Sequence, residues 1–439
     1  MISTEYKKLS EWAMDFALKN GCQSAKVILQ EGVNSSYSLR DAKIETLEQA
    51  SEMALGFHLY VDGRFGSFST NRLDKKELEQ FIKTGIEATR YLAVDKARTL
   101  PTSDRYYKGD LPNLQLYDNS FENIHPDEKV AIAKKVAHEI LGKDNRILSV
   151  SSSYSDGSSS VYQITSNGFE GETDRSWYNV SSSVSIKGEG EARPSDFWYD
   201  SAIYFSDLNT NGIGAKALER TLRKLGQKKV KSGKYTMLID SLTSSRLLSP
   251  LLGATYGNAL QQKNSFLEDK LNEKIGSSLF TLYDRPHIKR ASGARYFDGE
   301  GVATQTREIF TEGVLNTYFI DTYVGNKMGI TPTISGPSLL EMKLGPNNLE
   351  ELISSLDKGI LVTAFNGGNS NSSTGDFSFG VEGFLIEHGR LTQPISEMNI
   401  TGNLITLWAS LIGVGNDPKL SSSWRIPSLV FDNVDFSGL

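Results

Sequence analysis

Hydrophobic residues in the first hundred positions follow two different periods. Near the N-terminus apolar side chains recur every three or four residues, which predicts an amphipathic helix ending at Gly21. Apolar and polar residues then alternate over residues 25–61, as in antiparallel strands joined by short turns. A second helix is expected from Asp74, whose side chain is of the kind that caps a helix N-terminus. Helix, strands and helix predict an N-terminal α+β unit over residues 1–97.

The middle of the chain changes character twice. Residues 98–124 carry prolines and charges with little periodicity, which indicates a linker. A third helix is expected from Pro126, because proline costs no hydrogen bond in a first helical turn. Residues 147–205 are rich in Ser, Tyr and Val and predict long, half-exposed hairpins, with turns at Asp156-Gly157 and Asn167-Gly168.

A central helix-plus-hairpins unit therefore covers residues 125–228, and a C-terminal unit covers residues 229–439. The C-terminal unit opens with a short apolar strand, followed by a helical pattern over residues 241–260. Strand and turn patterns dominate the rest, apart from one helix over residues 349–358. The expected fold class is α+β, with a C-terminal unit built mostly of antiparallel sheet.

Composition narrows the function classes. The chain has 439 residues, 47 Lys and Arg against 53 Asp and Glu, and a formal net charge of −6. This balance excludes a strongly basic nucleic-acid binder, because Lys and Arg supply most of the non-specific affinity for phosphates. The single Cys22 excludes an internal disulfide framework and multi-cysteine zinc motifs. We see no secretory signal and no apolar run of about 18 residues, so we expect a cytoplasmic protein without a membrane segment.

Motifs of common enzymes are absent or incomplete. The sequence contains no G-x-S-x-G nucleophile elbow and no phosphate-binding P-loop. Residues 212–217 formally match G-x-G-x-x-A, but a polar stretch precedes them where a dinucleotide site needs a buried strand, so we interpret them as an ordinary helix start. His138-Glu139 lacks a second histidine four positions after the first, where Gly142 stands.

The acidic segment of residues 296–302 is unusual. Asp298 and Glu300 alternate with glycines there, a combination that suits a hard cation or an acid/base pair. Alternatively, the glycines adopt positive φ in a sharp turn, while the carboxylates cap backbone N–H groups or pair with Arg295. We favour this structural interpretation. The functional alternative is a hydrolytic or metal site formed by Asp298 and Glu300 with His287 or Asp376.

Several short motifs occur in a fixed order from end to end of the chain. They are GRFGSFST at residues 63–70, FDGEGVAT at 297–304, GVLNTYFIDTY at 313–323, TGDFS at 374–378, GFLIE at 383–387, PIS at 394–396 and GVGND at 413–417. In this order the chain resembles the TldD/PmbA family, once called modulators of DNA gyrase and now viewed as cytoplasmic metallopeptidases of bacteria and archaea. The resemblance implies an N-terminal α+β domain, a central domain and a sheet-rich C-terminal domain.

The resemblance also implies where a metal site would lie. In the TldD branch a helix carries H-E-x-x-x-H, two histidine ligands and a glutamate general base, and a cysteine near the C-terminus adds a ligand. A bound metal acidifies water, and the carboxylate accepts its proton. Here Gly253, Ala254 and Asn258 stand at the three helix positions and Val414 at the matching cysteine position. These side chains offer at most one weak oxygen ligand, so we expect no metal, cofactor or catalytic centre in this chain.

This pattern is similar to the PmbA branch, also called TldE, whose members look like the non-catalytic partner of a TldD-type subunit. The resemblance implies a peptidase complex with zinc only in the TldD-type partner, and a heterodimer with that partner or a homodimer. An unfolded peptide would be the substrate, held at sheet edges by β-augmentation. Two alternatives stay open: a hydrolase in its own right around Asp298 and Glu300, and a regulator of DNA gyrase by protein contact.

Overall fold

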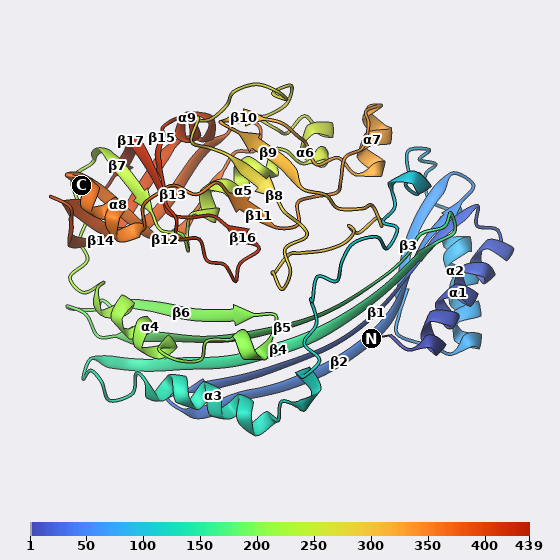
Figure 1. The fold of residues 1–439 in the computed structure, drawn as a ribbon, viewed down its shortest axis with the longest axis horizontal. Coiled ribbons are helices and arrows are strands. Elements are labelled where there is room, and N and C mark those ends of the chain that lie inside the picture. The colour runs from blue at the N-terminus through green and yellow to red at the C-terminus, as the bar shows by residue number, and fades with distance from the viewer. Residues whose placement is uncertain (1) are drawn as a thin grey trace.

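The chain folds into two layers that face each other. A computed structural model describes residues 2–439. Figure 1 shows a long curved sheet with helices on its convex side and the C-terminal unit opposite its concave side. This arrangement follows from the faces of the sheet, one apolar and one polar.

The curved sheet contains strands from both the N-terminal and the central unit. Its order is β3-β2-β1-β4-β5-β6, with every neighbouring pair antiparallel. β1 pairs with β4 from Lys26 opposite Thr165 to Arg40 opposite Ser151, so the two units share one continuous layer. The strands are β1 Ser24–Arg40, β2 Lys43–Val61, β3 Arg64–Thr70, β4 Ile147–Thr165, β5 Glu170–Ile186 and β6 Ser195–Ala202.

Alternation along the strands separates the two faces. Val27 and Leu29 of β1 pack with α1 and α2, and Leu39 of the same strand face packs with α3. The opposite face carries serines of β4, among them Ser153 and Ser155. On the concave face β4 therefore presents mainly polar side chains. The helices are α1 Thr4–Lys19, α2 Lys75–Arg90, α3 Pro126–His138 and α4 Ile213–Leu222, with helical turns η1 Ser103–Arg105, η2 Phe121–Asn123 and η3 Phe205–Asp207.

One of the two expected hairpin turns is confirmed, and the other is wrong. Asn167-Gly168 joins β4 to β5, with Gly168 at φ +101°. Asp156-Gly157 lies inside β4 instead. Asp156 is fully buried beneath α3, where Lys129 Nζ lies 2.6 Å from its carboxylate. Gly157 makes room for Trp177 on β5, because a Cβ there would lie 2.6 Å from the indole Nε1.

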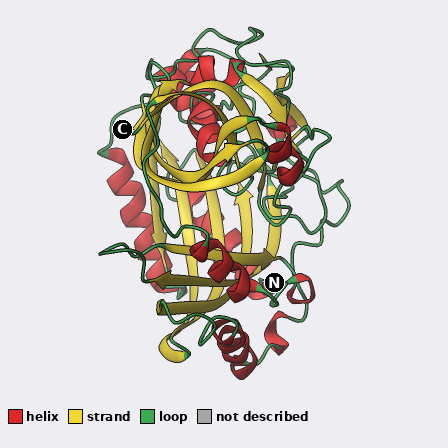
Figure 2. Ribbon diagram, turned by 90° about the vertical axis from the view of Figure 1, so that its left-hand side faces the viewer, coloured by secondary structure: helices red, strands yellow, loops and turns green. Residues whose placement is uncertain are grey.

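The C-terminal unit is built around a closed barrel. Five strands follow the order β14-β13-β12-β7-β17, and β17 also pairs with β14, which closes the ring seen in Figure 2. β15 continues from β17, and a second sheet has the order β10-β9-β8-β11-β16. The barrel strands are β7 Gly233–Ile239, β12 Lys358–Ser370, β13 Asp376–Glu387, β14 Arg390–Asn403 and β17 Leu429–Ser437, and the others are β8 Leu282–Asp284, β9 Arg307–Thr311, β10 Val314–Leu315, β11 Leu340–Met342, β15 Leu411–Val414 and β16 Trp424–Arg425.

A large apolar core lies between the barrel and the second sheet. It contains buried residues of the barrel and the second sheet together with four leucines of α5, Leu247, Leu248, Leu251 and Leu252. The helices of the unit are α5 Ser245–Gly253, α6 Gly257–Gln261, α7 Thr322–Met328, α8 Leu349–Ser355 and α9 Leu404–Ala409. No helix within residues 2–439 is both long and apolar enough to cross a membrane.

The start of α4 bears out the interpretation of residues 212–217. Gly212 has φ +72° directly before the helix, and the backbone N–H groups of Gly212 and Gly214 donate to the Glu139 carboxylate at 2.9 and 2.8 Å. A carboxylate at this end complements the helix dipole.

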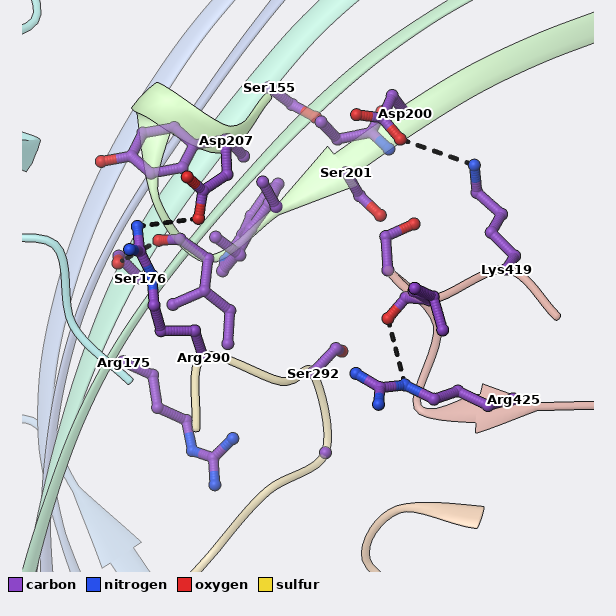
Figure 3. Close-up of a pocket in the computed structure, with 18 of the residues that line it drawn as sticks. Ser155, Arg175, Ser176, Asp200, Ser201, Asp207, Arg290, Ser292, Lys419 and Arg425 are labelled. Atoms are coloured by element: carbon purple, nitrogen blue, oxygen red, sulfur yellow. Dashed lines mark hydrogen bonds and ion pairs between the residues drawn. The ribbon is translucent and has the colours of Figure 1, made fainter. Parts of the chain in front are cut away.

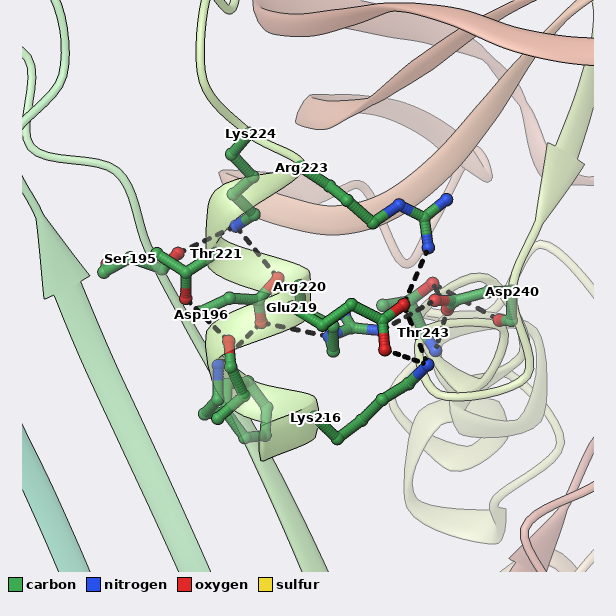
Figure 4. Close-up of polar contacts among 12 residues, drawn as sticks. Ser195, Asp196, Lys216, Glu219, Arg220, Thr221, Arg223, Lys224, Asp240 and Thr243 are labelled. Atoms are coloured by element: carbon green, nitrogen blue, oxygen red, sulfur yellow. Dashed lines mark hydrogen bonds and ion pairs between the residues drawn. The ribbon is translucent and has the colours of Figure 1, made fainter. Parts of the chain in front are cut away.

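A buried ionic network joins α4 to the barrel (Figure 4). Arg220 lies 3.4 Å from Asp196 and 3.9 Å from Asp240, measured between guanidinium nitrogen and carboxylate oxygen. Lys224, just beyond α4, lies 3.4 Å from Asp196 and 3.1 Å from Glu382. Charges as well as apolar contacts therefore hold the C-terminal unit over the sheet.

Candidate functional site

The segment that corresponds to the metal-binding helix of the TldD branch is not one helix in this chain. The continuous helix predicted over residues 241–260 is wrong, because the chain breaks between α5 and α6. Thr255 and Gly257 exchange backbone hydrogen bonds with Phe319, at 3.0 and 2.8 Å, and this pairing pulls the intervening residue Tyr256 into an extended conformation. A contact with a segment distant in sequence overrides the local helical pattern.

The four motif positions differ in exposure. Gly253 ends α5 and Asn258 lies in α6, and both are exposed. Ala254 is 2% exposed and Val414 is 8% exposed, and both belong to the apolar core. Zinc sites in proteins use nitrogen, sulfur or carboxylate oxygen ligands. Glycine, alanine and valine supply none, and asparagine supplies an amide oxygen, so this donor set does not fit a catalytic metal. Within residues 2–439 no three His, Cys, Asp or Glu side chains come together in a way that could hold a metal ion.

The acidic turn has the structural role expected of it. Asp298 is buried, and its Oδ1 accepts hydrogen bonds from the backbone N–H groups of Glu300 and Val302 at 2.9 and 3.0 Å. Gly301 has φ +88°, and a Cβ there would lie 2.8 Å from the Phe169 ring. The pairing considered with Arg295 is not formed, since that guanidinium donates to Ser338 and neighbouring carbonyls.

The acidic turn contacts both layers, α7 of the C-terminal unit through Glu300 and the curved sheet through Lys26. Its Oε2 accepts from both the backbone N–H and the hydroxyl of Thr322, at 3.0 and 2.9 Å. Lys26 of β1 donates to the carbonyl oxygen of Gly299. Burial raises the pKa of Glu300, and burial lowers the pKa of Lys26 to about 8 against the opposing charges of Asp298 and Glu300. The turn is a junction between the two layers.

The remaining candidate residues lie apart. His287 Nε2 lies 2.9 Å from the hydroxyl of Thr304, whose own proton goes to backbone carbonyls of the same loop. Asp376 begins β13, where Thr374 and Asn403 donate to its carboxylate at 2.7 and 3.0 Å. The structure thus brings Asp298 and Glu300 together, and it shows no contact between them and Asp376.

A cavity of about 900 Å³ lies between the two layers (Figure 3). Its floor is the concave face of β4, β5 and β6, and its other walls are two loops of the C-terminal unit, residues 290–293 and 419–425. Arg290 lies 2.7 Å from Asp207, and Lys419 lies 3.5 Å from Asp200. One signal of this site is visible in the sequence, the alternating serines of β4, which indicate a polar strand face.

Family models match three consecutive parts of the chain. The PmbA/TldA metallopeptidase domain 1 matches residues 25–89, the central domain matches residues 119–225, and the C-terminal domain matches residues 232–438. The chain belongs to the PmbA/TldD metallopeptidase family. The resemblance in the order of the motifs is thereby confirmed, and so is the α+β fold class.

Individual relatives of the PmbA/TldD family match over nearly the whole chain. A crystal structure from Bacteroides thetaiotaomicron, described as a candidate modulator of DNA gyrase, is 65% identical with a TM-score of 0.99 and full coverage of both chains. Metalloprotease PmbA of Escherichia coli O157:H7 is 26% identical, covering 98% of this chain and 97% of the relative. A Metalloprotease TldD homolog of Buchnera aphidicola subsp. Acyrthosiphon pisum is 23% identical, with 90% and 86% covered.

Proposed function

We propose that the chain is a non-catalytic PmbA/TldE-type subunit of a cytoplasmic TldD-type metallopeptidase complex, acting in proteolysis or peptide maturation. The observation that carries this proposal is the chemistry of the four motif positions. Gly253, Ala254 and Val414 have no donor atom in their side chains, and Asn258 has only an amide. A catalytic zinc site needs three protein ligands and an open position. The partner subunit would then hold the zinc and carry out the cleavage.

The open edge of β2 offers such a partner a docking strand. β3 pairs only with residues 55–61 of β2, so residues 43–54 pair with β1 on one side and with no strand of the described chain on the other. The opposite edge of the sheet is covered, because Lys224 and Lys419 donate to backbone carbonyls of β6. A homologous subunit with the same fold would present an edge of its own, and two such edges can pair antiparallel.

The charges on this edge favour a different chain over a second copy. Glu45, Glu48 and Glu52 stand on the open segment against the single Lys43. Two copies of the edge would bring like charges together along one ladder, which is destabilising. A TldD-type subunit with a more basic edge strand avoids that repulsion.

Reconstitution tests the proposal directly. The purified chain alone should contain no stoichiometric zinc and should not cleave an unfolded casein substrate, whereas mixing with a TldD-type homologue from the same genome should give a larger complex and activity. Leu47 is 54% exposed on the open edge. Leu47→Lys should weaken a complex with a more basic partner edge without lowering the stability of the isolated chain, with Leu271→Lys, at an exposed site of the C-terminal unit, as the matched control. One equivalent of zinc in the isolated chain, or no complex with the homologue, would refute the proposal.

A hydrolase site around Asp298 and Glu300 is the alternative within the same fold. Both carboxylates already accept backbone hydrogen bonds, which weighs against an acid/base role. Cleavage by the isolated chain, lost in Glu300→Gln, would favour it. The gyrase contact stands on the descriptions of solved relatives such as the Bacteroides protein, and a pull-down without gyrase subunits would remove it.

A further inference from the structure

The cavity between the two layers carries an excess of positive charge. Four of its lining side chains are cations, Arg175, Arg290, Lys419 and Arg425, and two are carboxylates, Asp200 and Asp207. Arg425 reaches Glu341 outside the cavity at 3.7 Å, but that carboxylate is shared with Arg285 at 3.1 Å. The walls therefore remain cationic after the ion pairs are counted.

Arg175 is the cation whose charge is least compensated. It projects from β5, and its guanidinium donates to the backbone carbonyl of Ala294. The salt bridges found among residues 2–439 give it no carboxylate partner. Burial and then the neighbouring charge of Arg295 lower the pKa of this guanidinium, yet arginine stays protonated at any physiological pH. A half-buried charge of this kind favours an anionic partner, because a carbonyl dipole offsets only part of its lost hydration.

Hydroxyl groups line the same cavity. Ser159 of β4 lies directly opposite Arg175 in the strand register, whereas Ser155 and Ser201 both lie opposite Asn179, farther along β5. Ser292 lines the cavity from the facing loop (Figure 3). Serine hydroxyls donate to an anion without adding charge, and arginine binds carboxylates with two parallel hydrogen bonds. Trp177 adds an apolar wall on the sheet side. A volume of about 900 Å³ lies within the range of about 300–1,000 Å³ usual for ligand sites.

We propose that this cavity binds the C-terminal carboxylate of a peptide, with Arg175 as its principal cationic contact. Only the choice of a peptide as the ligand rests on the proposed function. The carboxylate would complete the partner set of Arg175, while the rest of the peptide would lie along the serine-lined face of β4 and β5. The site needs neither a metal nor a second subunit, so it is present in the isolated chain.

Calorimetric titration of the isolated chain tests the site. The probe is a short unstructured peptide of Ala and Ser, used with a free C-terminal carboxylate and as the C-terminal amide. The free acid should bind about tenfold or more tightly than the amide, because a charge-assisted contact with half-buried Arg175 is lost in the amide. Equal binding of the two forms, or no binding of either, would overturn the inference without any variant, and neither result bears on complex formation with a TldD-type subunit.

Variants then assign the contact to Arg175. Arg175→Gln should bind the free acid as weakly as wild type binds the amide, and Arg175→Lys should keep part of the difference. Arg146→Gln is the matched control, because Arg146 is exposed outside the cavity and pairs with Asp144. Circular dichroism and gel filtration verify folding. An Arg175→Gln protein that still distinguishes acid from amide refutes the assignment.

Two further ligands test whether the cavity prefers a peptide C-terminus over other anions. An amidated peptide ending in Asp carries its carboxylate on a side chain, and inorganic phosphate carries charge without a peptide. Both should bind at least tenfold more weakly than the free acid. If either one matches it, the cavity is a general anion site and the peptide terminus is not its ligand.

Discussion

Asp240 provides a test of the ionic network between the layers. It follows β7 directly, is 5% exposed, and accepts hydrogen bonds from the backbone N–H and the hydroxyl of Thr243 at 3.0 and 2.7 Å. Burial raises its pKa from 3.8 to about 6, and Asp196 adds to the effect, while Thr243 and Arg220 oppose it. Arg220 does not hold the pKa down because it lies 3.9 Å away and is shared with Asp196. The folded state therefore contains a carboxylate whose ionisation is unfavourable.

The sign of the pH dependence follows from that pKa. A carboxyl with a higher pKa in the folded state than in the unfolded chain binds more protons when folded, between the two values. The free energy of unfolding contributed by Asp240 should therefore fall as the pH rises from about 4 to about 6, and the loss is complete above the folded pKa. The interval from 3.8 to about 6 corresponds to about 3 kcal/mol, at about 1.36 kcal/mol per pKa unit.

Asp240→Asn removes the titration and keeps an acceptor for Thr243. Urea unfolding of wild type and variant, followed by circular dichroism between about pH 4 and about pH 8, gives the difference in stability at each pH. That difference should move by about 3 kcal/mol in favour of the variant as the pH rises through the window. Asp15→Asn, at an exposed position on α1, is the matched control and should show no comparable change. A constant difference between Asp240→Asn and wild type at every pH would refute the reasoning.

Three further predictions rest on buried groups. Lys129→Met leaves the Asp156 carboxylate without its cation and should lower the free energy of unfolding by about 3–5 kcal/mol. Adding Asp156→Asn should recover part of that loss. Equal stability of the single and double variants would show that the two side chains are not coupled. Gly157→Ala should cost about 1–3 kcal/mol, because its Cβ would lie 2.5 Å from Asn34 Oδ1, whereas Gly253→Ala, with no atom within 4 Å of its Cβ, should be tolerated in the same unfolding assay. Burial raises the pKa of Cys22 to about 11, so alkylation near pH 8 should be far slower in the native protein than in urea, and equal rates would contradict that burial.

Local sequence signals predicted those helices and strands whose ends depend on residues nearby in the sequence. Asp74 caps α2 as expected, because its side chain needs only the next turn of backbone, and Pro126 starts α3 for a similar reason. The turn expected at Asp156-Gly157 is wrong because this dipeptide, although typical of turns, is held in β4 by contacts with Lys129 of α3 and Trp177 of the neighbouring strand β5. The break after Gly253 was missed because it depends on Phe319, far along the chain.

The candidate sites also differ in how much of each could be predicted from the sequence. The role of Asp298 could be inferred from the residues beside it, since the backbone groups it caps lie in the same turn. The cavity could not, because Arg175, Arg290 and Lys419 come from segments that only the folded layers bring together, and nothing in sequence distinguishes them from ordinary surface cations. The four motif positions are a third case: a side chain without a donor atom cannot become a metal ligand in any fold, so the argument about Gly253, Ala254 and Val414 needs no coordinates. A missing ligand at a known motif is therefore visible in sequence, whereas a new site assembled from distant segments is visible only in structure.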